Sequence, residues 1–239
     1  MLNNNFRSVL NQKLFEVLIQ CTQELNTESY LIGGFVRDHL LGREKAKDID
    51  IVALGSGIEL AKAIKQKLPN AKPIQIFKSY GTAMLQWEGI TIEFVGARKE
   101  SYSRESRNPK IFSGTLEEDL KRRDFTINAL AVSLNSKNIG KLIDPFNGLQ
   151  DLKNRVIKTP LDPSITYSDD PLRMLRAIRF AAQLKFKIEN RSLQAIKENA
   201  NRLSIINSER IVGELNKILM NQTPSVGYLL LQQTGLLEK

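Results

Sequence analysis

The sequence predicts an α+β fold: a mixed sheet with flanking helices over about residues 1–140, followed by an all-helical part over about residues 141–239. In the first part, short apolar runs typical of strands alternate with apolar residues at helical spacing. In the second part, long segments carry apolar residues at helical spacing. A chain of 239 residues is long enough to bury a substantial core in one or two domains.

The composition indicates a partner that carries negative charge. The net charge is +9 and the isoelectric point is near 9.6, so nucleic acid or a nucleotide is the first expectation and a generally basic surface is the alternative. Cys21 is the only cysteine, which excludes an internal disulfide and a zinc site of several cysteines. The only histidine, His39, lies on a predicted helix and is poorly placed for a catalytic triad. No apolar run reaches the roughly 18 residues of a membrane span and no signal peptide opens the chain, so we expect a cytoplasmic protein without a membrane partner.

The elements of the first part follow from apolar spacing. An amphipathic helix is expected over residues 6–25, and Glu88-Gly89 is expected to form a hairpin turn. The other expected elements are a strand ending at Ile32, a helix ending near Gly42, a strand at 49–52, a helix at 57–68, strands at 74–77, 82–87 and 90–95, and a hairpin of 131–134 with 141–143.

Asp48 and Asp50 stand on either side of Ile49 at the start of a predicted buried strand. Side chains alternate along a strand, so the two carboxylates point to the same face. Each resists ionisation beside the other unless a cation neutralises them, and Mg²⁺ is typically held by one or two carboxylates together with substrate phosphates. The alternative is a pair of solvated aspartates, because Asp-x-Asp alone is a weak signal.

Gly33 and Gly34 lie between the strand that ends at Ile32 and the next predicted helix. Glycines before a helix N-terminus let backbone N–H groups approach an anion closely, and the helix dipole favours phosphate there. Arg37 adds a fork of donors that suits phosphate oxygens. A Gly-Gly pair alone is weak evidence, but together with the aspartates it predicts a phosphate cradle one helix away from a metal-binding strand.

Gly33-Gly34-Phe35-Val36-Arg37-Asp38, followed by Asp48-Ile49-Asp50, resembles the head domain of the class II tRNA nucleotidyltransferase and bacterial poly(A) polymerase family. That family belongs to the DNA polymerase beta-like nucleotidyltransferases. The resemblance extends from about residue 30 to about residue 220. It implies a palm-like nucleotidyltransferase head over 1–140, and a helical neck with the start of a body domain over 141–239.

The resemblance also assigns roles to two later regions of the head. Glu93 matches the third catalytic carboxylate, although it also fits a solvent-facing position on an edge strand. Residues 98–123 read as a long charged loop, which is either solvated surface or functional. In the family this is a mobile loop associated with adding the terminal A, so its presence argues against an enzyme that adds only CC.

Arg123, Asp124 and Asn128 belong to the stretch Arg-Arg-Asp-Phe-Thr-Ile-Asn-Ala. Asp124 and Asn128 are four apart, so on a helix they would share one face beside Arg123. A carboxylate and an amide can hold ribose hydroxyls while the arginine reaches phosphate. The alternative is that Asp124 caps a helix. The stretch matches the family motif that contacts the sugar.

The predicted helix from Pro171 to Leu184 is apolar nearly all round and therefore buried, yet it carries a polar stripe of Asp170, Arg173 and Arg176. Buried charges are costly unless paired, so the stripe is expected to line a cleft. Asp170 and Arg173 could pair and present a mixed donor and acceptor edge to a cytosine or adenine, although Asp170 before Pro171 is also a good N-cap. In the family, Glu-Asp-x-x-Arg selects the incoming base. This chain has Asp169 in place of the Glu.

The remaining predictions concern the neck. Residues 144–152 resemble the family's hinge motif, and 208–215 resemble its last motif, in which Glu209 and Arg210 are expected to be structural. Further helices are expected at 191–199, 208–219 and from Gly227 to Leu237.

Together these features predict a template-independent nucleotidyltransferase that uses Mg²⁺ to add C, A or both from CTP and ATP to the 3′ end of tRNA, releasing pyrophosphate. Asp48 and Asp50 would hold the metal and Glu93 would complete the catalytic site. The predicted nucleotide-binding residues are Gly33, Gly34, Arg37, Arg123, Asp124, Asn128, Asp170, Arg173 and Arg176. A poly(A) polymerase, an A-only enzyme and a non-catalytic RNA-binding module remain alternatives.

Overall fold

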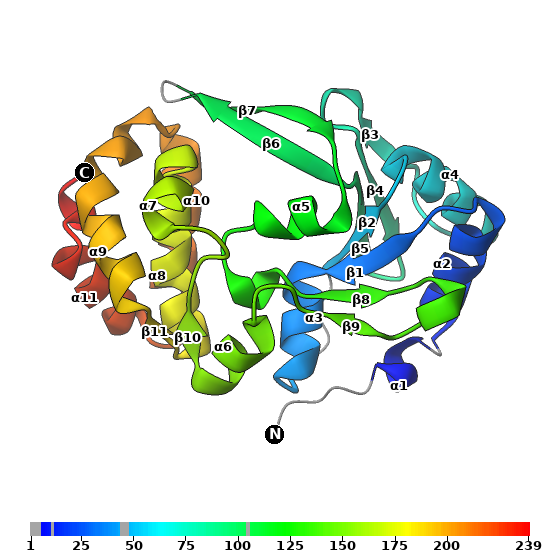
Figure 1. Cartoon of the computed structure of the whole chain (residues 1–239), viewed down its shortest axis with the longest axis horizontal. Coiled ribbons are helices and arrows are strands. Elements are labelled where there is room, and N and C mark those ends of the chain that lie inside the picture. Colours follow the sequence, from blue (N-terminus) through cyan, green and yellow to red (C-terminus); the bar gives the residue numbers. More distant parts are fainter. Residues whose placement is uncertain (1–5, 11, 44–47, 104–105) are drawn as a thin grey trace. The chain divides into compact units, whose positions relative to one another are not determined.

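The computed structural model describes residues 6–10, 12–43, 48–103 and 106–239, which fold into two compact units (Figure 1). Arg104 of the predicted charged loop lies outside the described residues. The first unit comprises residues 1–99, 111–121 and 128–148, and the second comprises 100–110, 122–127 and 149–239.

A seven-stranded mixed sheet forms the centre of the first unit. Its strands, in spatial order, are β3 (Gln75–Phe77), β4 (Thr82–Trp87), β5 (Ile90–Gly96), β2 (Asp48–Ala53), β1 (Ser29–Ile32), β8 (Ala131–Ser133) and β9 (Leu142–Ile143). β2 and β5 are parallel, and the other neighbours are antiparallel. Glu88 and Gly89 both have positive φ between β4 and β5, which confirms the predicted hairpin turn.

Helices cover one face of this sheet. α4 (Gly57–Lys67) packs against β2, β4 and β5 and is itself contacted by α2 (Lys13–Glu24). The strands send fully buried side chains such as Ile51, Ile92 and Phe94 to this face. The single helix predicted over residues 6–25 is wrong: α1 (Arg7–Leu10) ends before α2 begins, because Gln12 takes an extended conformation that a helix cannot contain.

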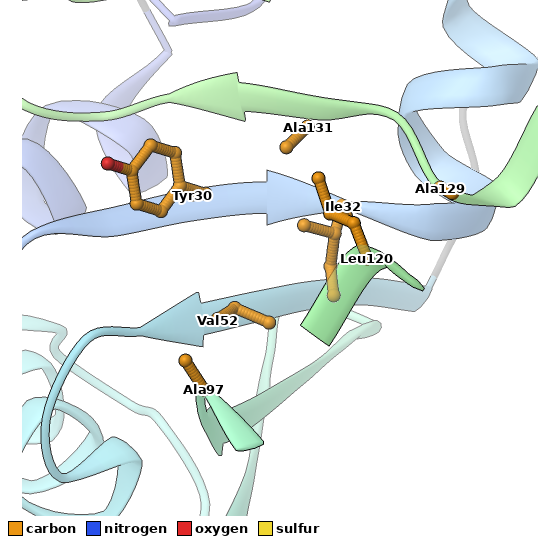
Figure 2. Packing of buried hydrophobic residues seen from close by; sticks show 7 residues of the cluster. All are labelled: Tyr30, Ile32, Val52, Ala97, Leu120, Ala129 and Ala131. Atoms are coloured by element: carbon orange, nitrogen blue, oxygen red, sulfur yellow. The ribbon is translucent and has the colours of Figure 1, made fainter. Parts of the chain in front are cut away.

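The other face of the sheet is partly covered by a small core (Figure 2). Tyr30 and Ile32 of β1, Val52 of β2 and Ala131 of β8 pack with Leu120 of α5 (Leu116–Lys121). Val52 shares this face with Asp48 and Asp50, because residues two apart on a strand point the same way. The apolar core therefore ends where the two aspartates begin.

Residues 98–123 do not form the predicted loop. β6 (Arg98–Ser103) and β7 (Ser106–Ser113) pair with each other as a two-stranded sheet, and α5 follows. The prediction was wrong because the pairing of two strands depends on backbone hydrogen bonds, which a charged sequence without apolar alternation does not reveal.

From residue 149 onward, the described part of the second unit is helical apart from one short pair of parallel strands, β10 (Val156–Ile157) and β11 (Lys187–Ile188). At its centre, α8 (Leu172–Leu184) packs against α7, α10 and α11, and nine of its residues are buried as its apolar sequence predicted. The other helices are α6 (Gly148–Asn154), α7 (Pro163–Asp169), α9 (Asn190–Asn199), α10 (Ser208–Leu219) and α11 (Pro224–Gln233).

The predicted α+β class, a mixed sheet with flanking helices followed by a helical region, is therefore confirmed. None of the helices in the described part of the chain combines the length and apolar character that a membrane span requires.

Candidate functional site

The sheet brings the predicted carboxylates and the glycine pair together in the first unit. Asp50 lies opposite Glu93 on the parallel strand β5 and opposite Ile32 on the antiparallel strand β1. Since Gly33 follows Ile32, the glycine pair begins at the strand position beside Asp50. Asp48 points to the same face as Asp50. The predicted proximity of the aspartates to the glycines is confirmed, whereas the roles of these residues stay predictions.

The carboxylates face solvent while the residues between them are core. Asp48 and Glu93 are exposed and Asp50 is half-buried. Ile49 and Ile51 alternate with the aspartates, so they point to the opposite face. There they are buried, with exposed fractions of 2% and 0%. Among the described residues, no group of three or more aspartate, glutamate, histidine or cysteine side chains is arranged so that it could hold a metal ion.

The glycine pair forms the first turn of α3 (Gly33–Leu40). Gly33 has φ of +70°, a conformation that turns the chain sharply from strand to helix. The N-cap residue is Ile32, which has no side-chain group that could bond the first amides of the helix. These amides, at the positive end of the helix dipole and beside Asp50, can receive an anion.

Arg37 is buried inside the first unit. Its Nε and Nη2 donate to the carboxylate of Asp38 at 3.0 and 2.9 Å, and its Nη1 donates to Oδ1 of Asn128 at 2.7 Å. The side chain therefore ties α3 to the segment before β8. Its predicted contact with phosphate stays a prediction.

Gly33→Ala is expected to lower the free energy of unfolding by about 1–2 kcal/mol, because a Cβ at positive φ approaches its own carbonyl oxygen too closely. Gly34→Ala is the matched control. A Cβ there meets only Nη2 of Arg37 at 3.6 Å, an ordinary contact, so we expect no loss. Urea unfolding of both variants measures the difference, and equal losses would contradict the assignment of the strained position to Gly33.

In the second unit, Asp124 and Arg176 form an ion pair. Oδ2 of Asp124 accepts from Nε of Arg176 at 2.8 Å and from its Nη2 at 2.6 Å, while Oδ1 accepts from the amide of Phe125 at 2.9 Å. Asp124 is buried, and its carboxylate is the main reason why the pKa of Arg176 is raised. The guanidinium of Arg176 therefore stays charged at any ordinary pH.

The predicted helix face shared by Asp124 and Asn128 is wrong. Only residues 126–128 form a single 3₁₀ turn, and Asp124 lies outside it. The amide of Thr126 donates to the carbonyl of Lys158 at 2.8 Å and its hydroxyl donates to Asp151 at 2.6 Å, so the backbone bonds of this segment do not follow a helical pattern. The ribose roles of Asp124 and Asn128 stay predictions, as does the phosphate contact of Arg123, which is half-buried.

Asp170 and Arg173 do not pair with each other among the described contacts. Nη2 of Arg173 donates to the carbonyl oxygen of Arg122 at 2.6 Å, and Oδ1 of Asp170 accepts from the amide of Leu172 at 3.3 Å. The carboxylate of Asp170 therefore bonds the first amide of α8, while the N-cap position itself is taken by Pro171. Both side chains are half-buried, so each remains partly accessible.

A second ion pair on α8 was missed. Nη1 of Arg179 donates to Oε1 of Glu214 on α10 at 3.1 Å, and both residues are largely buried. Glu209 and Arg210 are exposed, and the expectation that they are structural rather than catalytic stays a prediction. Arg179, a further arginine on the mostly buried helix α8, was the available signal, because a buried arginine requires a partner.

Two family descriptions match the chain. Residues 29–158 match the "Poly A polymerase head domain", and residues 185–239 match the "Probable RNA and SrmB-binding site of polymerase A". An A-adding tRNA nucleotidyltransferase of Aquifex aeolicus is 44% identical over 72% of this chain and 20% of its own length. A CCA-adding enzyme of Geobacillus sp. is 42% identical over 92% of this chain and 52% of its own length.

Solved structures agree with these similarities. The structure of a Thermotoga maritima CCA-adding enzyme complexed with tRNA superposes with a TM-score of 0.83 at 35% identity, covering 99% of this chain and 53% of that one. The chain spans about half the length of most of the first curated relatives that it matches.

Proposed function

The chain belongs to the family of the poly(A) polymerase head domain, and on that premise we propose that it is a template-independent RNA nucleotidyltransferase. It transfers CMP, AMP or both from CTP and ATP to the 3′ hydroxyl of tRNA and releases pyrophosphate. The names of its relatives support this proposal, since the Geobacillus protein is a CCA-adding enzyme and the Thermotoga enzyme is seen with tRNA.

The observation that carries the proposal is the strand register around Asp50. One neighbour across the sheet is Glu93 and the other is Ile32, directly before the glycine turn. A carboxylate pair and a helix N-terminus are thus placed side by side, as a reaction that handles a metal-bound nucleoside triphosphate requires. A protein that only binds RNA has no need for acidic residues on this face.

The donor set fits Mg²⁺, which we propose as the cofactor. Asp48 and Asp50 supply hard oxygen ligands on one face, and Mg²⁺ usually takes only one or two carboxylates, with water and phosphate oxygens as its other ligands.

Each part of this site has a separate proposed role in the reaction. When bound, the metal lowers the pKa of the attacking hydroxyl and neutralises charge on the leaving pyrophosphate. The first amides of α3 hold the phosphate oxygens, and Gly33 allows them to approach closely. Arg37 keeps α3 in position through Asn128. Glu93, opposite Asp50, is the residue that we propose completes the site beside the attacking RNA hydroxyl.

Base selection is proposed for the second unit. Asp170 and Arg173 lie at the start of α8, and the backbone bonds that each makes fix their orientation. A carboxylate acceptor and a guanidinium donor held in this way can discriminate between the Watson–Crick edges of cytosine and adenine. The boundary between head and neck, predicted at residues 140 and 141, stays a proposal, and the last strand of the sheet ends shortly after it at Ile143.

Arg173→Ala is expected to reduce the discrimination between CTP and ATP by roughly tenfold or more, because the site loses its donor to the base. The KM for the triphosphate should change less, since the phosphates bind elsewhere. Steady-state kinetics with each nucleotide measures both quantities. Arg191→Ala, which removes an exposed arginine of the same unit, should change neither. Unchanged nucleotide preference in Arg173→Ala would remove the base-selection claim.

The function itself is tested by incubating the chain with Mg²⁺, labelled CTP or ATP separately, and tRNA that lacks its 3′ end. Extension with both nucleotides supports CCA addition. Extension with ATP alone supports an A-adding enzyme, an alternative favoured by the similarity to the Aquifex protein. Untemplated runs of A indicate a poly(A) polymerase, and binding without extension indicates a non-catalytic RNA-binding module.

A further inference from the structure

The strand β3 at the edge of the sheet, together with the turn that follows it, carries exposed apolar side chains. Phe77 is 46% exposed and Tyr80 is 63% exposed, whereas Phe94 inside the same sheet is fully buried. β3 is the outer strand of this sheet, and in the described part of the chain no other strand pairs with its free side (Figure 1). We call residues 75–80 the β3 edge.

The strand register places Phe77 on the same face of the sheet as the carboxylates. Phe77 lies opposite Thr82, Thr82 opposite Val95, and Val95 opposite Val52. Val52 points to the same face as Asp50, so Phe77 does too. Phe77 and Asp50 are three strand spacings apart across the sheet and two residues apart along it, which is a separation of roughly 15 Å. Ile76 points to the opposite face.

The β3 edge is also basic. Residues 71–87 contain no acidic residue. Lys72 and Lys78 are exposed on either side of β3. Nζ of Lys72 donates to Oε1 of Gln86 at 3.0 Å, a neutral partner that leaves its charge uncompensated. Among the described residues, no carboxylate forms an ion pair with Lys78. A partner that suits this surface carries negative charge and has planar aromatic groups that can stack on the exposed rings.

We propose that the β3 edge binds the single-stranded 3′ segment of the RNA substrate, upstream of the reacting hydroxyl. Bases stack on Phe77 and Tyr80, and phosphates lie near Lys72 and Lys78. Exposed aromatics beside lysines are the combination by which proteins hold single-stranded nucleic acid. The inference rests on the proposed function for the identity of the RNA, and the site lies outside the residues 185–239 that match the RNA-binding description.

The first test is binding of the full chain to a fluorescein-labelled, unstructured single-stranded RNA with a free 3′ hydroxyl, followed by anisotropy. Replacing both Phe77 and Tyr80 by alanine should raise the Kd by roughly tenfold or more, because stacking contributes substantially for each base. Phe77→Trp should bind like the wild type, and Phe77→Leu should bind as weakly as Phe77→Ala.

Ile76→Ala is the matched control, because it removes an apolar side chain of the same strand from the other face and should leave the Kd unchanged. Lys78→Gln should reduce the slope of log K against log salt by about one. An unchanged Kd in the double alanine variant, or no RNA binding by the wild-type chain, overturns the proposal. Wild-type affinity in Phe77→Leu also overturns the proposal, because leucine keeps apolar area but cannot stack on a base. A surface that requires only apolar area would instead bind a protein partner.

Nucleotide incorporation by the same variants separates this proposal from the proposed function. If the wild-type chain extends RNA, the double alanine variant should show a raised KM for RNA and an unchanged KM for the nucleotide. If the wild-type chain binds RNA through Phe77 and Tyr80 but extends nothing, the enzymatic proposal fails and the RNA site stands. Extension with an unchanged KM for RNA in the double variant leaves the enzyme and removes the site.

Discussion

Asp50→Ala and Asp48→Ala are each expected to lower nucleotide incorporation by at least about a thousandfold, because metal ligation supplies several kcal/mol of transition-state stabilisation. Folding should survive. Both side chains reach solvent, and each substitution removes repulsion between neighbouring carboxylates, so the free energy of unfolding should not fall by more than about 1 kcal/mol. Single-turnover incorporation and urea unfolding measure the two effects separately.

Glu59→Gln provides the control for this experiment. Glu59 is an exposed carboxylate on α4, the helix that covers the opposite face of the sheet, where it pairs with Lys62 at 2.8 Å. Its replacement should leave incorporation unchanged. Full activity of either aspartate variant would refute the metal assignment, even if the register around Asp50 were correct.

Asp124→Ala is expected to lower the free energy of unfolding by about 2–3 kcal/mol, because it leaves the Arg176 guanidinium without the carboxylate that pairs with it. The loss is smaller than for a fully buried pair, since the Arg176 side chain is 32% exposed and water can partly replace the partner. Arg176→Met removes the other partner. Urea unfolding of both variants and of the double variant completes a thermodynamic cycle.

The double variant should lose less than the sum of the two single variants, because the pair is already broken by the first change. Asp162 and Arg191 supply the comparison, because their 3.5 Å ion pair is solvent-exposed. Arg191→Ala leaves Asp162 in place as the N-cap of α7 and should cost at most about 1 kcal/mol. Strict additivity of the Asp124 and Arg176 effects would contradict the direct bonding of these side chains.

Much of the site could be predicted because its residues are close together in the sequence. The two-residue spacing of Asp48 and Asp50, with Ile49 and Ile51 alternating between them, determines which face each side chain takes as soon as a strand forms. The strand, glycine and helix order around Gly33 likewise determines that a helix N-terminus follows β1. Such patterns depend only on local backbone geometry.

The partners of the buried arginines could not be predicted in the same way. Arg37 meets Asn128, 91 residues away, and Arg176 meets Asp124, 52 residues away. Asp124 and Asn128 seemed to belong to one helix because of their spacing, but the backbone of this segment bonds to Lys158 and forms only a short turn. Spacing predicts a shared face only when the segment is in fact a helix.

By itself, the sequence determined the class of fold, the order of most elements, and the acidic strand beside a glycine turn, because side-chain periodicity and turn chemistry act over a few residues. Only the tertiary structure decided that Asp50 lies between Ile32 and Glu93, and that Phe77 shares the face of the carboxylates. It also decided that Asp124 and Asn128 each bond an arginine. Those relations depend on strand register and on pairs formed across long loops, which are set by the packing of the whole unit and not by any local stretch of chain.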